Sequence, residues 1–139
     1  MLKRLYKIGL LILLVSLPQS VIADDFAEVR VAVKKYFDGT EQGKPELIRE
    51  TFLPTLEIQY VTPEGTLGRL PAAEYISRFK PGKKANRKGR IVQMDVTGTA
   101  ATVKAEIIMG ERLYTDYLLL LKLPEGWRVS NKIATFRQR

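Results

Sequence analysis

Asp116 has the surroundings that best suit chemistry in this sequence. It lies mid-strand between Tyr114 and Leu118, and the two-residue repeat of a strand places these three side chains on one face. A carboxylate among apolar side chains needs a cation or hydrogen-bond donors to stay buried. Asp116 therefore acts either as an acid or base in a pocket or as a structural group paired with Lys132 on the next predicted strand. We favour the structural role, because ion pairs of this kind are common away from active sites.

Tyr60 and Trp127 are the aromatic candidates for contact with a ligand. Tyr60 follows Ile58 on one face of a short predicted strand. There a phenol at the rim of an apolar cavity can orient a ligand or complete the core. Trp127 opens the last predicted strand, where its indole can stack on a flat ligand or pack against Leu119 or Leu121. We favour packing for Trp127.

Asn131 is the amide candidate on the same predicted strand as Trp127. Strict alternation along this strand places Asn131 on the face shared by Trp127 and Val129 and turns Lys132 to the other face. An amide on the inward face can bind a ligand or satisfy hydrogen bonds of the core. The structural role is again the one we favour.

The composition excludes several classes of catalytic site. The chain has no Cys and no His. This rules out a Ser-His-Asp triad, a Cys-His pair, a histidine-based metal site and any disulfide. Glycine-rich phosphate loops and metal-ligand spacings are also missing from the sequence. We therefore expect neither a metal nor a cofactor.

A basic segment spans residues 78–90. Its seven cations are Arg78, Lys80, Lys83, Lys84, Arg87, Lys88 and Arg90. No aromatic residue interleaves positions 80–90, so bases have no stacking platform there and we expect no nucleic-acid partner. The segment is either a solvated loop that aids solubility or a contact for an anionic surface, and we favour the solvated loop.

The first 23 residues have the pattern of a cleavable signal peptide. Lys3, Arg4 and Lys7 precede the apolar run 8–17, and Ala23 supplies a small residue before the expected cut. That run is much shorter than the roughly 20 residues of a membrane-spanning helix. We expect an exported, periplasmic or secreted protein whose mature domain covers 24–139.

Hydrophobic periodicity predicts an α+β domain with helices first and strands last. Phe26, Val29, Val33 and Tyr36 fall on one face of a helix that Asp24 or Asp25 is expected to cap. The predicted helices span 25–42, 45–53 and 72–79, and the predicted strands span 56–61, 66–69, 89–96, 100–109, 113–123 and 127–136. The last four strands, joined by short turns, indicate an antiparallel meander. We expect the N-terminal helices to pack on one face of a curved antiparallel sheet.

This order of elements resembles the nuclear transport factor 2-like (NTF2-like) superfamily, and within it the putative lumazine-binding family. The segments that carry the resemblance are 33–39, 46–52, 67–69, 114–118 and 127–132. Leu53 and Pro54 follow Phe52, where members of the family often have a histidine. The resemblance implies a cone-shaped fold with a cavity for a small molecule and a homodimer formed through the sheet. The family name implies a flavin-like ligand.

Three functions are compatible with these patterns. The first is an exported module that binds a small apolar or aromatic molecule. The second is an enzyme of isomerase or cyclase type with Asp116 as general base. The third is an accessory interaction protein whose cavity is filled by its own side chains. For the binding module, the expected lining residues are Tyr60, Tyr114, Asp116, Trp127 and Asn131.

The state of the cavity distinguishes the three functions. A roomy cavity with Asp116 free of cations favours the enzyme. Pairing of Asp116 with Lys132 in a roomy cavity favours binding alone. A cavity plugged by Phe26, Phe37 or Tyr75 favours the interaction protein.

Overall fold

A computed structural model describes residues 19–139, with side chains from Asp24 onward. The predicted signal peptide over 1–23 lies outside this part, apart from the helical backbone of 19–23, and stays a prediction. Within the described residues, no helix is both long enough and apolar enough to cross a membrane.

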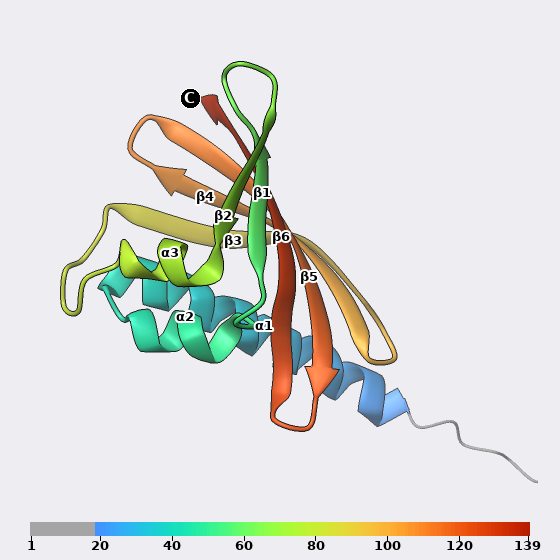
Figure 1. Cartoon of the computed structure of the whole chain (residues 1–139). Helices are drawn as coiled ribbons and strands as arrows, with labels where there is room; N and C mark the ends of the chain where they lie inside the picture. The colour runs from blue at the N-terminus through green and yellow to red at the C-terminus, as the bar shows by residue number, and fades with distance from the viewer. Residues whose placement is uncertain (1–18) are drawn as a thin grey trace, which may run out of the picture.

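Three helices pack on one side of a twisted six-stranded sheet (Figure 1). The helices are α1 (Gln19–Gln42), α2 (Pro45–Thr51) and α3 (Ala72–Ser77). The strands are β1 (Glu57–Val61), β2 (Leu67–Pro71), β3 (Arg87–Thr97), β4 (Ala100–Met109), β5 (Arg112–Leu123) and β6 (Gly126–Gln138). Every predicted helix and strand is present, although several ends differ from those that periodicity predicts.

The sheet is mixed, which corrects the expectation of a wholly antiparallel sheet. Its strand order is β2-β1-β6-β5-β4-β3. Strands β3 to β6 form the predicted antiparallel meander, whereas β1 runs parallel to β6, with Ile58 opposite Lys132. A parallel neighbour arises because the β1–β2 hairpin is separated from β6 by a long crossover through α3 and the rest of the meander.

Helix α1 lies across the concave side of the sheet and buries one face completely. Val29, Val33 and Tyr36 on this face are 0% exposed, as the 3.6-residue period predicts. The expected cap at Asp24 or Asp25 is wrong, because the helix begins at Gln19. Asp25 instead forms an ion pair with Lys122 of β5 and so joins the helix to the sheet.

A row of aromatic rings leads from α1 towards α3. The ring centroids of Tyr36 and Phe52 lie 5.1 Å apart, those of Phe52 and Tyr75 lie 6.0 Å apart, and those of Tyr75 and Phe79 lie 5.1 Å apart. These rings fill the space between the helices and the sheet up to α3. Beyond them the sheet curves away, and the interior opens into a cavity.

Candidate functional site

A cavity of about 570 Å³ opens between α3 and the inner face of the sheet; we call it the sheet cavity. Its lining residues are Ile58, Tyr60, Val61, Leu70, Tyr75, Arg78, Phe79, Ala85, Arg87, Met109, Tyr114, Asp116, Lys132, Ala134, Thr135 and Phe136. Apolar side chains dominate this set, while charged and hydroxyl groups meet at the inner end. Tyr75 forms part of the wall, and Phe26 and Phe37 are not among the lining residues, so the cavity is not plugged.

The polar end of the sheet cavity is built around the hydroxyl group of Tyr36 on α1. This hydroxyl donates a hydrogen bond of 2.9 Å to Oδ2 of Asp116. It accepts one of 2.7 Å from Nζ of Lys132 and one of 2.9 Å from an Nη atom of Arg87. Tyr75 of α3 places its own hydroxyl 3.2 Å away. Side chains from α1, α3, β3, β5 and β6 therefore meet at one point, which we call the cavity floor.

Asp116 and Lys132 form a buried ion pair at this floor. Nζ of Lys132 lies 2.7 Å from Oδ2 of Asp116, and the two side chains are only 4% and 1% exposed, respectively. The geometry matches the structural pairing expected from the sequence. Both Tyr36 and Lys132 reach Oδ2, and no hydrogen bond from the described residues reaches Oδ1.

A β-bulge in β6 brings Lys132 into the cavity and turns Asn131 away from it. Leu119 of β5 pairs with Asn131 of β6, and the next residue, Leu120, pairs with Val129. Ser130 has no partner between them and is therefore an extra residue in β6. One extra residue reverses the alternation of the side chains that follow it. The expected inward position of Asn131 is therefore wrong: Lys132 is inward and Asn131 lines neither of the cavities described here.

Tyr36 keeps its proton at the floor. Burial raises the pKa of Tyr36 well above its ordinary value, and the negative charge of Asp116 raises it further. A protonated phenol can donate one hydrogen bond and accept two. These three bonds are the ones that Tyr36 makes with Asp116, Lys132 and Arg87.

Arg87 is a cavity residue that sequence reasoning placed only in the basic segment. Its guanidinium donates to the hydroxyls of Tyr36 and Tyr75, at 2.9 and 3.1 Å, and lies 5.9 Å from the centre of the Phe79 ring. Three other cations of the segment are paired with acids: Arg78 with Glu74, Lys88 with Glu41 and Arg90 with Glu106. Gly89 packs against the ring of Phe37, so it faces inward, and the two-residue repeat of β3 places Arg87 on the same face. The predicted strand began only at residue 89 and therefore left Arg87 in the loop.

Tyr60 and Tyr114 lie at the open end of the sheet cavity, as the sequence predicts. Tyr60 is 38% exposed, and its ring lies so close to Gly68 on β2 that a Cβ there would meet ring atoms at 2.4 Å. Tyr114 packs against Phe136 on the neighbouring strand, with ring centroids 5.3 Å apart. Aromatic rings thus frame the entrance, and charged groups occupy the floor.

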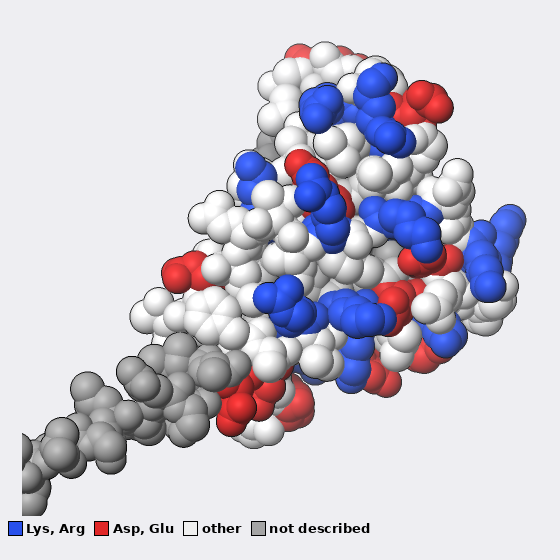
Figure 2. Space-filling view, turned by 180° about the vertical axis from the view of Figure 1, so that it is seen from behind, with Lys and Arg blue, Asp and Glu red and all other residues white. Residues whose placement is uncertain are grey.

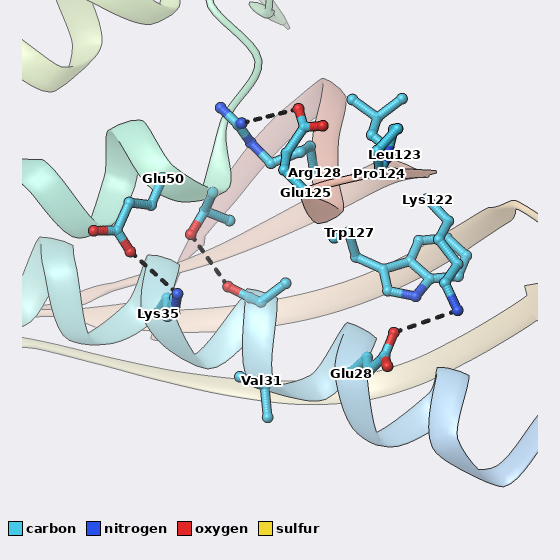
Figure 3. A pocket seen from close by; sticks show the side chains of 13 residues that line it. Glu28, Val31, Lys35, Glu50, Lys122, Leu123, Pro124, Glu125, Trp127 and Arg128 are labelled. Atoms are coloured by element: carbon cyan, nitrogen blue, oxygen red, sulfur yellow. Dashed lines mark hydrogen bonds and ion pairs between the residues drawn. The ribbon is translucent and has the colours of Figure 1, made fainter.

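Trp127 lies in a separate cavity of about 410 Å³ between α1, α2 and the β5–β6 hairpin (Figure 3). The indole is 4% exposed, whereas Leu119 and Leu121 are exposed on the outer face of β5, so Trp127 packs against neither. Three carboxylates line this second cavity, and each is paired with a lysine or arginine, as between Glu50 and Lys35. Charge is therefore balanced in the second cavity.

Within residues 19–139 no group of acidic side chains is arranged to hold a metal ion. The chemistry that this part of the chain offers is hydrogen bonding and charge at the cavity floor, surrounded by apolar and aromatic walls.

Comparisons with known proteins agree on the family and the fold. A family model described as "Putative lumazine-binding" matches residues 24–135. An NTF2-like protein of unknown function from Silicibacter pomeroyi DSS-3 superposes with a TM-score of 0.74 and 18% identity, over 84% of this chain and 98% of that chain. A second one, from Shewanella baltica OS155, gives 0.74 and 21% over 84% and 97%.

A ketosteroid isomerase-like protein from Erwinia carotovora atroseptica also shares the fold, with a TM-score of 0.63 and 11% identity over 84% of this chain and 98% of that chain. No curated protein sequence matches the chain. Identities at this level establish the architecture, and the family model covers most of the chain. The chain therefore belongs to the putative lumazine-binding family and has the NTF2-like fold.

Proposed function

We propose that the protein binds a small molecule in the sheet cavity. The observation that carries this proposal is the combination of an open volume of about 570 Å³ with apolar walls and a few convergent polar groups at one end. Cavities of roughly 300–1,000 Å³ with this distribution of groups are typical ligand sites. Tyr60 and Tyr114 would contact the body of the ligand, and the cavity floor would hold its polar end.

The pairing at the floor supports binding over acid–base catalysis. A general base needs an oxygen that is free to take a proton from the substrate. Oδ2 of Asp116 is engaged by Tyr36 and Lys132. Oδ1 makes no hydrogen bond with the described residues, but the ion pair with Lys132 already balances the negative charge that a general base would use to attract a proton. Pairing of Asp116 with Lys132 in a roomy cavity is also the arrangement that we expected of a protein that binds a ligand without acid–base catalysis.

Fluorescence titration with N-phenyl-1-naphthylamine, a neutral apolar probe whose emission rises in apolar sites, tests this proposal. Two variants of β6 locate the probe. Ala134 lines the sheet cavity, so Ala134→Trp fills part of it, whereas Ile133 is exposed on the opposite face, so Ile133→Trp leaves it open. We expect saturable binding to the unmodified protein and to Ile133→Trp, and at least tenfold weaker binding to Ala134→Trp. Absence of saturable binding, or equal binding to both variants, would refute the proposal.

A homodimer and export complete the proposed function. The outer face of β5 and β6 exposes four large apolar side chains: Tyr117, Leu119, Leu121 and Ile133. A contiguous apolar patch of this kind is typical of a protein–protein interface, and a second copy of the chain is the partner we propose. Export rests on the sequence pattern of residues 1–23 alone.

The basic segment contributes less to the proposed function than its charge suggests. Figure 2 shows lysine and arginine side chains spread over the face seen from behind, with acidic groups among them. Because Arg78, Lys88 and Arg90 are each paired with an acid, contact with an anionic surface would depend mainly on Lys80, Lys83 and Lys84. We propose such contact only as a weak, salt-sensitive interaction.

A further inference from the structure

We propose that the ligand of the sheet cavity is an amphiphilic carboxylate, with its anionic group bound by Arg87 and Tyr75 and its apolar body between the aromatic walls. This inference rests on the proposed function and adds the chemical class of the ligand. It follows from the charges and the hydrogen-bond capacity of the cavity floor.

The charges that line the sheet cavity do not balance. Three cations and one anion line it: Arg78, Arg87, Lys132 and Asp116. Arg78 is paired with Glu74 outside the cavity, and Lys132 is paired with Asp116. Arg87 has only neutral hydroxyl groups as strong partners among the described residues. The floor therefore carries one positive charge that no carboxylate of the described chain neutralises.

Burial acts against the charge of the Arg87 guanidinium, because the low local dielectric removes the stabilisation that water gives to a charge, and the one carboxylate that offsets it, Asp116, is shared with Lys132. A bound anion would offset this loss. The second cavity serves as an internal comparison, since each carboxylate there is already paired with a cation. Of the two cavities described here, the sheet cavity is the one whose lining includes a cation without a carboxylate partner among the described residues.

Hydrogen-bond donors also remain unused at the floor. The hydroxyl of Tyr36 makes the full number of bonds open to a phenol, with Asp116, Lys132 and Arg87. The hydroxyl oxygen of Tyr75 accepts a hydrogen bond from Arg87. Its own proton lies near the Tyr36 oxygen, 3.2 Å away, but both lone pairs of that oxygen already accept from Lys132 and Arg87. That proton is available to a ligand in the cavity.

Arg87 likewise has more donors than acceptors around it. A guanidinium carries five N–H groups. One Nη serves the two tyrosines, the other approaches only the sulfur of Met109 at 4.0 Å, and Nε is buried without a partner among the described residues. A carboxylate accepts through two oxygens and donates nothing when ionised, and it is the natural complement of a guanidinium beside a phenol.

The walls above the floor determine the rest of the ligand. Leu70, Phe79, Met109 and Phe136 are among the apolar residues that line the cavity. A purely inorganic anion would leave this apolar surface in contact with water. A carboxylate attached to an aromatic or aliphatic body fills both parts, and the net positive charge of the chain would attract it.

Competition against bound N-phenyl-1-naphthylamine tests this inference. The competitors are 2-naphthoate and 2-naphthamide, which have nearly the same shape and differ in charge. We expect naphthoate to displace the probe at a concentration at least about tenfold lower than naphthamide, the gain expected of a charge-assisted hydrogen bond in a partly buried site. Arg87→Gln should reduce this ratio to near one.

Two further variants make the test specific. Arg90→Gln removes an outward-facing arginine of the same strand, paired with Glu106, and should leave the ratio unchanged. Tyr75→Phe keeps the ring and removes only the proton that we assign to the ligand, so it should lower the ratio several-fold even where Arg87→Gln proves unstable.

The outcomes separate this inference from the proposed function. Probe binding with equal displacement by both competitors would overturn the carboxylate class and leave the binding function standing. A ratio that survives in both Arg87→Gln and Tyr75→Phe would overturn the assignment of these residues. Failure of the probe to bind at all would overturn both.

Discussion

Removing Lys132 is the sharpest test of the buried ion pair at the cavity floor. In Lys132→Met the methionine keeps the apolar stem of the lysine and loses its charge. Asp116, whose side chain is 1% exposed, then keeps a single hydrogen bond, from Tyr36. A buried carboxylate has given up its hydration by water, and without the lysine most of the interaction energy that offset this loss is gone.

The expected cost is about 3–5 kcal/mol of unfolding free energy, the range for breaking a buried pair by removing one partner. Domains of this size have a total of about 5–15 kcal/mol. Replacing both partners, in Lys132→Met with Asp116→Leu, removes the stranded charge as well. We expect this double variant to be more stable than Lys132→Met alone by at least about 2 kcal/mol.

Urea unfolding followed by tryptophan fluorescence measures these differences. Trp127 is the single tryptophan of the sequence and is 4% exposed, so its emission reports the loss of the core. Lys34→Met is the matched control, because Lys34 pairs with Asp38 on the surface of α1 and should cost less than about 0.5 kcal/mol. A cost below about 1 kcal/mol for Lys132→Met would mean that water reaches the pair, and the reasoning about the floor would be wrong.

Four other predictions follow from the fold and the site. Leu119→Glu should convert a dimer into monomers in analytical ultracentrifugation, whereas Val31→Glu on α1 should not; a dimer unaffected by Leu119→Glu would place the interface elsewhere. Burial raises the pKa of Tyr36, so the folded state keeps a proton that the unfolded state releases above about pH 10. The unfolding free energy should therefore fall as the pH rises past this value, and the fall should be smaller in Tyr36→Phe. Gly43→Ala should lower the unfolding free energy by at least about 1 kcal/mol, measured by urea unfolding, because Gly43 has φ of +66° and a Cβ there would meet backbone of the 80–83 turn. N-terminal sequencing of the protein from its own host should begin at Asp24, and an intact Met1 would contradict export by cleavage.

Much of the fold could be predicted from periodicity, because several elements carry a regular hydrophobic repeat along their own sequence. The inward face of α1 repeats every three or four residues, and β4 alternates along its whole length, so both are fixed by local pattern. The parallel pairing of β1 with β6 was missed. It depends on where a hairpin docks after a long crossover, which no local pattern records.

The site was predictable only where strands alternate without interruption. Asp116 and Tyr114 lie on β5, which has no extra residue before Leu119, and the sequence assigned their face correctly. Strict alternation along β6 predicted Asn131 inward, and the bulge at Ser130 reverses the face of the residues that follow it, so Lys132 is inward instead. Arg87 was hidden among six other cations, because composition does not show which of them points inward.

The contacts of the Tyr36 hydroxyl limit which substitutions the protein can tolerate during evolution. This hydroxyl holds α1 to three strands, β3, β5 and β6, through one oxygen, at the place where a ligand would be anchored. Substitutions there would weaken the architecture and the recognition together, and selection would eliminate most of them. Tyr60 and Tyr114 at the entrance make none of these contacts with the floor, so substitutions there would alter the shape of the proposed ligand site without weakening the contacts that join α1 to the sheet.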